Sequence, residues 1–524
     1  MVTRAATATL AYLTVTEGRA PPSSSGAAGG GIANAGTLTL QASAVLKNSA
    51  GDTGGGIQNT GRLTLENSSV TANRTTTPGS SLSEGGMGGG IYNFLGTVTV
   101  ANSILRGNTA SIGGGIFSIG GTVILSGSSV LSNTGSSNGG GLYSDRGALT
   151  LTHSTVSGNR DGGVDESMGI MTVTQSTITN NSGSYGGGLS SSGNETFGSL
   201  TLIHSTVSGN RAIQGGGLYL FQSTARVEES TITGNTASVS GGGIVNGGTM
   251  TVTHSAISGN RAGFNGGGLS SQGILTVLRS TVTANTASYG GGLNNFAGHV
   301  RVLSSTISGN TAAQGGGLYN NGGLYNNGGG RITVRDSTLS ANRATGSGGG
   351  LDDAYDVRNC APDRDCTGGV TLGNSTLSGN TAARGGAIAN TGHDTMSLSF
   401  VTIAGNSSGI AITGTSTVIL TGTLLATNTP GVNCRGRLSE GQGYNLDSGT
   451  SCGFLRGTDL THTRPRLAPL ANTGGPTQTI ALLPGSPALD HGGQRRTGCP
   501  ATDQRGVSRP QGASCDIGAF ERQP

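Results

Sequence analysis

The stretch GGGIYNFLGTVTVANSILRGN, residues 88–108, contains the pattern that decides the fold. It consists of a glycine run that ends in an apolar residue, an alternating segment GTVTV at 96–100, and a short segment that ends at Asn108. Alternation with period two is typical of strands, and glycine or asparagine between such segments favours turns. The stretch therefore predicts three short strands separated by turns, with no helical apolar stripe.

The same pattern recurs along most of the chain. The asparagine that ends it returns most often after 25 residues, and without interruption from Asn210 to Asn310. The eight letters HSTVSGNR even occur twice, at 153–160 and 204–211. A fixed period of this length predicts a solenoid. Leucine-rich repeats would place their leucines differently, and calcium-binding glycine-aspartate repeats would need a recurring aspartate. We therefore predict an all-β, right-handed parallel β-helix of about 14–16 coils of roughly 25 residues each.

Columns of equivalent residues indicate how such coils stack. Three residues before each of these asparagines lies Val, Ile or Leu, and five before lies Ser in every repeat but the last, where Val401 stands. We expect the aliphatic column to point inward and the serines to line a bend. The asparagines are expected to form a ladder of side-chain amides from coil to coil. Its most regular members are Asn210, Asn235, Asn260, Asn285 and Asn310.

Composition and charge exclude several classes of protein. Glycine supplies 100 residues and charged residues only 10%, against roughly 25% in a typical globular chain, so the core must be narrow. The net charge is +4, Lys47 is the only lysine and no block of like charges occurs, which argues against nucleic-acid binding. No apolar run approaches the ~20 residues of a transmembrane segment. No signal peptide is visible at the N-terminus, and we expect a monomer.

The six cysteines form three pairs that are close in sequence, and none has the CxxC spacing of zinc or redox sites. We expect disulfides and therefore an oxidising compartment, with the protein extracellular or at the cell surface or outer membrane. The pairs are Cys360 with Cys366, Cys434 with Cys452, and Cys499 with Cys515.

The histidines of the repeats are not expected to do chemistry. His153, His204 and His254 fall in one column, which in other repeats holds asparagine, glutamine, glutamate, arginine or aspartate. A position that accepts acid, base and amide is a solvated turn position.

An acidic insert is the first candidate site. The segment LDDAYDVRNCAPDRDCTGG, residues 351–369, carries Asp352, Asp353 and Asp356, whose carboxylates could bind Ca²⁺. The alternative is a polar loop held by a disulfide. No other cofactor is expected.

A column of aromatic residues is the second candidate, as a ligand-binding face. It lies just after the apolar residue of the glycine strand and holds Tyr92, Phe117 and Tyr143 in successive repeats, with Tyr219 and Tyr319 further on. Exposed aromatic rings in this arrangement could bind sugar rings. They could equally shield the sheet by stacking on one another.

The rhythm of the repeats fades after Asn428. The segments GYNL, NTGGPTQT, LLPGSPALD, DQRG and CDIGAFE follow within 431–524. This region resembles the choice-of-anchor Q domain of bacterial surface proteins. Residues 1–430 are similar to chlamydial polymorphic outer-membrane-protein repeats and to pectin lyase-like right-handed β-helices. The resemblance implies an exported surface protein and supplies no catalytic residues. We expect residues 431–524 to continue and cap the β-helix, with Asp490, Asp503, Arg505 and Asp516 paired in a polar lid over its open end.

Two functions compete. The first is a non-enzymatic adhesin or spacer that binds an extracellular glycan or a host or matrix protein. The second is a polysaccharide lyase or glycoside hydrolase, which would need carboxylates from separate coils within ~10 Å of each other, or a metal with a base. Only Asp352 and Asp353 approach this arrangement, so we expect no enzyme.

Overall fold

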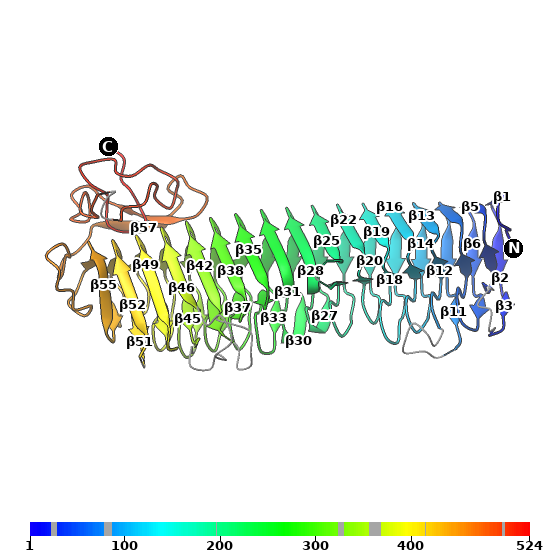
Figure 1. The fold of residues 1–524 in the computed structure, drawn as a ribbon, viewed down its shortest axis with the longest axis horizontal. Coiled ribbons are helices and arrows are strands. Elements are labelled where there is room, and N and C mark those ends of the chain that lie inside the picture. The colour runs from blue at the N-terminus through cyan, green and yellow to red at the C-terminus, as the bar shows by residue number, and fades with distance from the viewer. Residues whose placement is uncertain are drawn as a thin grey trace. The chain divides into compact units, whose positions relative to one another are not determined.

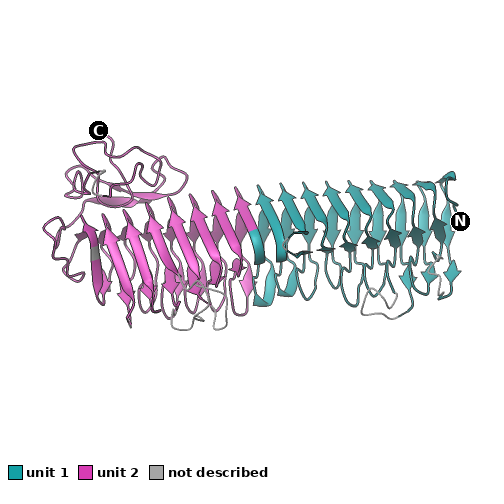
Figure 2. Cartoon of the chain, in the orientation of Figure 1, with its two compact units in different colours: residues 1–249 teal, residues 250–524 magenta. Residues whose placement is uncertain are grey.

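The computed structural model describes residues 1–22, 29–77, 86–194, 196–322, 330–355, 368–413, 415–494 and 498–524. Every regular element among these residues is a strand, and none is a helix that could cross a membrane. The chain forms two compact units, Met1–Thr249 and Met250–Pro524, which are considered one at a time (Figure 2).

In the first unit the strands of a coil pair in parallel with those of the neighbouring coils (Figure 1). A coil has the three expected strands, and some coils have a further short one, such as β7 (Ser49–Ala50), which pairs with β11 (Arg74–Thr75). Equivalent residues of the repeats lie opposite one another: Ile91 is paired with Ile57 and Ile116, and Leu105 with Val70 and Val130. The parallel β-helix of about 25 residues per coil is therefore confirmed. Successive strands of one such coil are β12 (Ile91–Phe94), β13 (Thr97–Ala101) and β14 (Ile104–Arg106).

The interior is the narrow aliphatic core that the sequence predicts. Val70, Leu105 and Val130 are fully buried, as are their equivalents Ile257, Val282 and Ile307 in the second unit. Each buried aliphatic side chain contributes about 1.5–3 kcal/mol. Because every coil contributes only a few, a coil depends on its neighbours for stability.

The asparagine ladder is present in both units. In each step the Nδ2 atom of one asparagine donates to the Oδ1 atom of the next at 2.9–3.0 Å. In the first unit the ladder runs from Asn48 to Asn235, and in the second from Asn260 to Asn428, one coil beyond the repeats recognised in the sequence. The serines at the bend also link coils, since the backbone N–H of Ser43 donates to the hydroxyl of Ser68.

The histidine column lies at a turn, as expected. His153, His204 and His254 adopt φ values of 49°, 46° and 48°, in the left-handed region that the other residues of this column also adopt. The imidazole of His204 lies 3.0 Å from Glu229 of the next coil, and both side chains are about half exposed. Among the described residues no group of three or more His, Cys, Asp or Glu is arranged to hold a metal ion.

The C-terminal region of the second unit continues the helix before leaving it. β54 (Cys434–Arg435), β55 (Leu438–Gly443) and β56 (Leu446–Asp447) pair in parallel with the preceding coil. An antiparallel hairpin follows, formed by β57 (Leu467–Ala471) and β58 (Thr479–Leu482).

After β56 the chain pairs once more with the last coil, at Leu460 with Leu446, whereas residues 477–520 pack on the flank of the helix and not across its end as a lid (Figure 1). The side chain of Gln504 bonds to the hydroxyls of Thr338 and Thr376, and the N–H of Ala519 donates to the hydroxyl of Thr402 at 2.9 Å. These threonines occupy third strands of successive coils, and all three are buried. The predicted lid is therefore wrong in its position, because the hydrogen-bonding partners of the segment lie along the coils.

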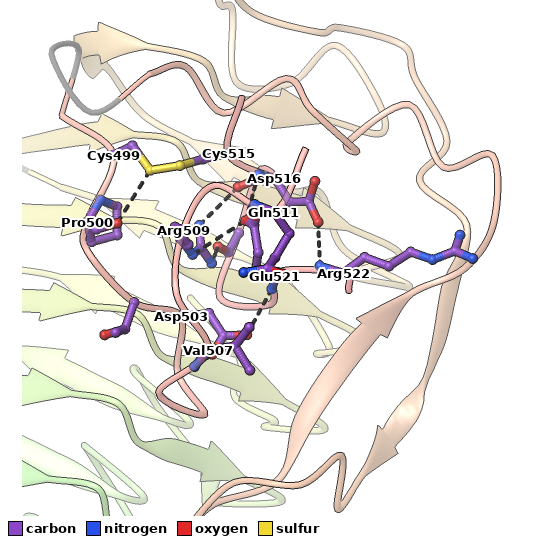
Figure 3. Close-up of polar contacts among 12 residues, drawn as sticks. Cys499, Pro500, Asp503, Val507, Arg509, Gln511, Cys515, Asp516, Glu521 and Arg522 are labelled. Atoms are coloured by element: carbon purple, nitrogen blue, oxygen red, sulfur yellow. Dashed lines mark hydrogen bonds and ion pairs between the residues drawn. A yellow bond between two sulfur atoms is a disulfide. The ribbon is translucent and has the colours of Figure 1, made fainter. Parts of the chain in front are cut away.

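The disulfide Cys499–Cys515 and the buried Arg509 lie within this segment (Figure 3), and the disulfide Cys434–Cys452 lies at the last coil. The disulfides Cys434–Cys452 and Cys499–Cys515 are confirmed, and Cys360 and Cys366 lie outside the described residues. Arg509 is fully buried and donates to the carbonyls of Asp516 and Gly518 at 3.1 and 2.7 Å.

The polar residues expected to pair with one another do so in part. Asp503 pairs with Arg505 at 2.7 Å. The carboxylate of Asp516 instead accepts the backbone N–H groups of Asp490 and Arg522.

Candidate ligand-binding site

The aromatic column of the first unit forms a continuous stack over three coils. The ring centroids of Tyr92 and Phe117 are 5.5 Å apart and those of Phe117 and Tyr143 are 5.4 Å apart, with interplanar angles of 2° and 6°. Phe117 is only 1% exposed, so its ring is not available to a ligand. Mutual shielding therefore describes this stack, and the expectation of an exposed ring at Phe117 is wrong.

Tyr319 of the second unit is also buried, at 6% exposed. Its ring packs against Tyr289 with 5.3 Å between centroids and an angle of 41°. It too offers little surface to a ligand.

The stack is interrupted after Tyr143, and this interruption makes a groove. The next two coils place Asp165 and Ser190 in the same column, on β21 (Val164–Ser167) and β24 (Leu189–Ser192), before Tyr219 follows on β28 (Leu218–Glu228). Tyr143 and Tyr219 are thus three strand spacings apart, about 14 Å. The two short side chains leave a hollow of about 260 Å³ between them.

We call this hollow the tyrosine groove. Its walls include Tyr185, which is 52% exposed and tilts against Tyr219 with 5.1 Å between ring centroids. Its polar lining is Asn138, Asp165, Glu166, Ser190 and Ser192, and its aromatic lining is Tyr143, Tyr185, Tyr219 and Phe221. Tyr185 and Phe221 are not in the predicted column, so the sequence pattern did not identify them.

Asp165 is one of two acidic residues that line the groove, beside Glu166. Its carboxylate accepts the backbone N–H of Gly139 at 2.6 Å, and its residue is 9% exposed. Burial, with a smaller contribution from Asp161, raises the pKa of Asp165 well above the ordinary value of 3.8. Burial also raises the pKa of Tyr143 to about 12, so this phenol stays neutral and can donate a hydrogen bond.

A second, mostly polar column runs inside the helix, two residues after the apolar residue of the glycine strands, with Leu220 and Ile412 as apolar exceptions. Asn59 donates to Asn93 at 2.7 Å in the first unit, and Asn295 donates to Asn320 at 2.8 Å in the second. The asparagine that ends the motifs GGGIYN and GGGLYN indicates this column, but we did not predict it from the sequence. The column comprises Asn34, Asn59, Asn93, Ser118, Ser144, Glu166 and Ser191 in the first unit, and Ser271, Asn295, Asn320, Asp353 and Asn390 in the second.

Two acids stand in this inner column. Glu166 is 1% exposed, accepts the hydroxyl of Ser191 at 3.1 Å and also accepts the N–H of Gly169. Burial raises its pKa to about 7. Asp353 is fully buried and accepts Nδ2 of Asn320 at 2.9 Å.

The predicted calcium ligands do not converge. Asp352 and Asp353 are neighbours on β45 (Leu351–Asp353), so their side chains point to opposite faces of the sheet. Asp352 is also fully buried, and its carboxylate accepts hydroxyls of Ser347 at 2.5 Å and Thr391 at 3.2 Å. Asp356 lies outside the described residues. The pair Asp352 and Asp353 therefore cannot share one ion.

Asp353 has a different partner in the next coil. Asp394, which precedes β49 (Thr395–Ser399), lies beside it. Burial, together with the charge of Asp394, raises the pKa of Asp353 well above its ordinary value. Burial raises the pKa of Asp394 to about 6. The oxygens of Asp394 and the Oδ2 atom of Asp353 are buried. Carboxylates from separate coils thus do meet, but inside the protein and out of reach of a polymer.

Comparisons with known proteins add little to this description. No protein-family model matches the chain, and no curated protein matches it. Among solved structures, the chain is similar to the crystal structure of pectate lyase Pel9A, with 11% identity over 89% of this chain and 88% of that one. The TM-score is 0.23, which is too low to carry an argument about function.

Proposed function

We propose that this protein is a non-enzymatic, exported surface protein that binds glycans, and that the tyrosine groove holds the sugar. The observation that carries the proposal is the gap in the aromatic stack. It leaves one ring face of Tyr143 without an aromatic neighbour, next to a carboxyl and two serine hydroxyls.

The chemistry of the groove suits a sugar ring. A pyranose has apolar C–H faces and a rim of hydroxyl groups, so it fits a site with aromatic walls and a few polar groups placed between them. The hollow of about 260 Å³ is slightly below the range of about 300–1,000 Å³ usual for small-molecule sites. We therefore expect it to accept one or two residues of a glycan chain.

The positions of the carboxylates favour binding over hydrolysis. A glycoside hydrolase needs two carboxyl groups flanking the scissile bond, ~5–10 Å apart. The described lining of the groove contains two carboxyl residues, of which Asp165 shares the column of the tyrosines and Glu166, its neighbour on β21, belongs to the inner column. The carboxylate of Glu166 is held by Ser191 and Gly169.

Export is supported by the two disulfides, which persist in oxidising compartments. The motif resemblance to choice-of-anchor Q domains and to polymorphic outer-membrane-protein repeats supports placement at a cell surface. The role we propose is that of an adhesin or spacer that presents its glycan-binding coil away from the cell.

The test is binding of the purified full chain to a panel of neutral oligosaccharides, measured by isothermal titration calorimetry, beside an assay for reducing-sugar release. We expect binding without release. Tyr143→Ala and Tyr219→Ala should each weaken binding by roughly tenfold, the effect of losing about 1–1.5 kcal/mol of ring contact. Tyr12→Ala is the matched control, because Tyr12 is 82% exposed and lies outside the groove.

Two results would contradict the proposal. The first is sugar release that disappears in Asp165→Asn, which would make the groove an active site. The second is binding that Tyr143→Ala and Tyr219→Ala leave unchanged.

A further inference from the structure

The tyrosine groove combines aromatic rings with acidic groups. Residues 161–203, in the two coils that interrupt the aromatic stack, contain four acidic residues and no Lys, Arg or His. A cation is attracted by the face of an aromatic ring and by a carboxylate. We propose that the glycan of the groove is an amino-sugar polymer, and that a protonated amino group of it lies between the ring of Tyr143 and the carboxyl of Asp165. This inference rests on the proposed function and names the class of sugar.

Asp165 stands directly beside Tyr143. The two residues are paired on neighbouring strands, so their side chains leave the same face of the sheet about 4.8 Å apart. Phe117 covers the opposite side of the Tyr143 ring, with 5.4 Å between the centroids. A sugar ring that packs on Tyr143 from the groove therefore brings one of its substituents next to Asp165.

One carboxyl oxygen of Asp165 has no hydrogen-bond partner among the described residues. The carboxylate accepts the backbone N–H of Gly139 through Oδ2, whereas Oδ1 is buried and unpaired. Asp165 nevertheless lines the hollow. An unpaired polar atom in a protein interior is costly, and an ammonium group at the wall of the hollow would supply the missing donor.

The second unit contains the same pair of residue types in a different state. Asp352 is paired with Tyr319 as Asp165 is paired with Tyr143. Both carboxylate oxygens of Asp352 accept hydroxyl groups of the protein. The unpaired oxygen is therefore a feature of the groove and not of every acid in this column.

The charged groups around the pair favour a cation. Besides burial, the charge of Asp161 raises the pKa of Asp165, and the charges of Asp145 and Glu166 raise the pKa of the neighbouring tyrosine. Arg146 is paired with Asp145 at 2.7 Å. The described lining of the groove contains no Lys, Arg or His, so an ammonium group would meet an excess of negative charge.

The lining favours an amino sugar over a bare metal ion. A calcium ion needs about six to eight oxygen ligands, whereas four of the nine lining residues are aromatic. A glucosamine unit would use each kind of group: its C–H face packs on a ring, its hydroxyls bond to Ser190 and Ser192, and its amino group donates to Asp165.

The test compares three oligosaccharides that differ in one substituent of each sugar. They are a glucosamine trimer, the same trimer with N-acetyl groups, and the glucose trimer with the same linkage. Binding to the full chain is measured by isothermal titration calorimetry near neutral pH. We expect the glucosamine trimer to bind roughly tenfold more tightly than either of the others, because the cation adds its attraction to the same ring contact.

Variants separate the charge from the ring contact. Asp165→Asn keeps the shape of the side chain and an acceptor for Gly139, and should make the affinities for the glucosamine and glucose trimers nearly equal. Tyr143→Ala should weaken binding of all three trimers. Glu229→Gln is the matched control and should keep the preference, since Glu229 is a half-exposed acid of the same unit outside the lining of the groove.

A measurement on the wild type needs no variant. Burial raises the pKa of Asp165 well above 3.8, so this carboxyl takes up a proton as the pH falls from about 7 to about 4. The amine of the ligand is more fully protonated at the lower pH, so its own titration would strengthen binding. We expect the preference for the glucosamine trimer to decrease instead, because a neutral carboxyl attracts a cation less.

Failure of this inference can be told from failure of the proposed function. If the three trimers bind equally and Tyr143→Ala weakens them all, the amino-sugar preference is refuted and glycan binding in the groove stands. A preference that Asp165→Asn preserves, or that grows as the pH falls, would also refute the inference. No binding of any trimer, or binding that Tyr143→Ala leaves unchanged, would contradict both.

Discussion

Replacing Asp353 by asparagine should stabilise the protein at neutral pH. Asp353 occupies a position of the inner polar column that holds asparagine in the coils on either side, at Asn320 and Asn390. Its carboxyl is buried beside that of Asp394, and burial raises the pKa of both acids. An amide at this position keeps the hydrogen bond with Asn320 and carries no charge at any pH.

The size of the effect follows from proton linkage. A rise in pKa from 3.8 to about 6, as for Asp394, corresponds to about 3 kcal/mol. When the folded protein holds a carboxyl proton more tightly than the unfolded chain, stability is full below the ordinary pKa and falls as pH rises through the folded pKa. Asp353→Asn should therefore gain stability at pH ~7.5 and much less at pH ~4, because the pKa of Asp353 is raised in the folded protein.

The assay is differential scanning calorimetry of the wild type and the variant at both pH values. We expect the variant to melt roughly 5 °C higher at the neutral pH. Asn320→Asp is the matched control, because it adds an acid to the same column and should lower the melting temperature at neutral pH more than at acid pH. A variant that melts lower than the wild type at neutral pH, or whose gain is the same at both pH values, would refute the reasoning.

Three further predictions concern stability. Asn285→Ala removes hydrogen bonds to the Asn310 side chain and to the Ile257 carbonyl, both 3.0 Å, and should lower the free energy of unfolding in urea by about 3 kcal/mol. A loss below about 0.5 kcal/mol would show that the ladder contributes little. Replacing Cys434 and Cys452 together by serine removes the disulfide between these residues, which are 18 apart, and should lower the free energy of unfolding by about 3 kcal/mol. Reduction of the wild type should cause the same loss, and no loss on reduction would show that the bond is absent in solution. Arg509→Met removes the guanidinium 3.6 Å from the buried carboxylate of Glu521 and should lower the free energy of unfolding by about 3–5 kcal/mol. Limited proteolysis should then cut the C-terminal segment first, and adding Glu521→Gln should restore part of the resistance to the protease.

The repeating parts of the fold could be predicted because equivalent residues have the same environment, buried or exposed, in every coil. The aliphatic residue three positions before each ladder asparagine is buried in every repeat, so the sequence pattern alone identifies this column as part of the core. The turn that contains His153 could be predicted because residues of many types occur at this position in other repeats, as is typical of a side chain in solvent.

The site could be predicted only in part because it depends on departures from the repeat. The groove exists where Asp165 and Ser190 interrupt the aromatic column, and one wall is Tyr185, which belongs to a turn and reaches Tyr219 only after folding. The pair of Asp353 and Asp394 is separated by an insert, so its spacing in the chain gives no sign of the contact.

The surface against which the C-terminal segment packs could not be predicted from the sequence either. Thr338, Thr376 and Thr402 stand where other coils have threonine or serine facing outward, and only the folded segment shows that they are covered.

The most direct test of the central claim is a crystal structure of the full chain with the oligosaccharide that binds it most tightly. We expect an intact glycan with one sugar ring stacked on the face of Tyr143 that is turned away from Phe117, and a sugar hydroxyl within hydrogen-bonding distance of Asp165. A sugar bound on another surface while the groove contains only solvent, or a glycan cleaved at Asp165, would contradict it.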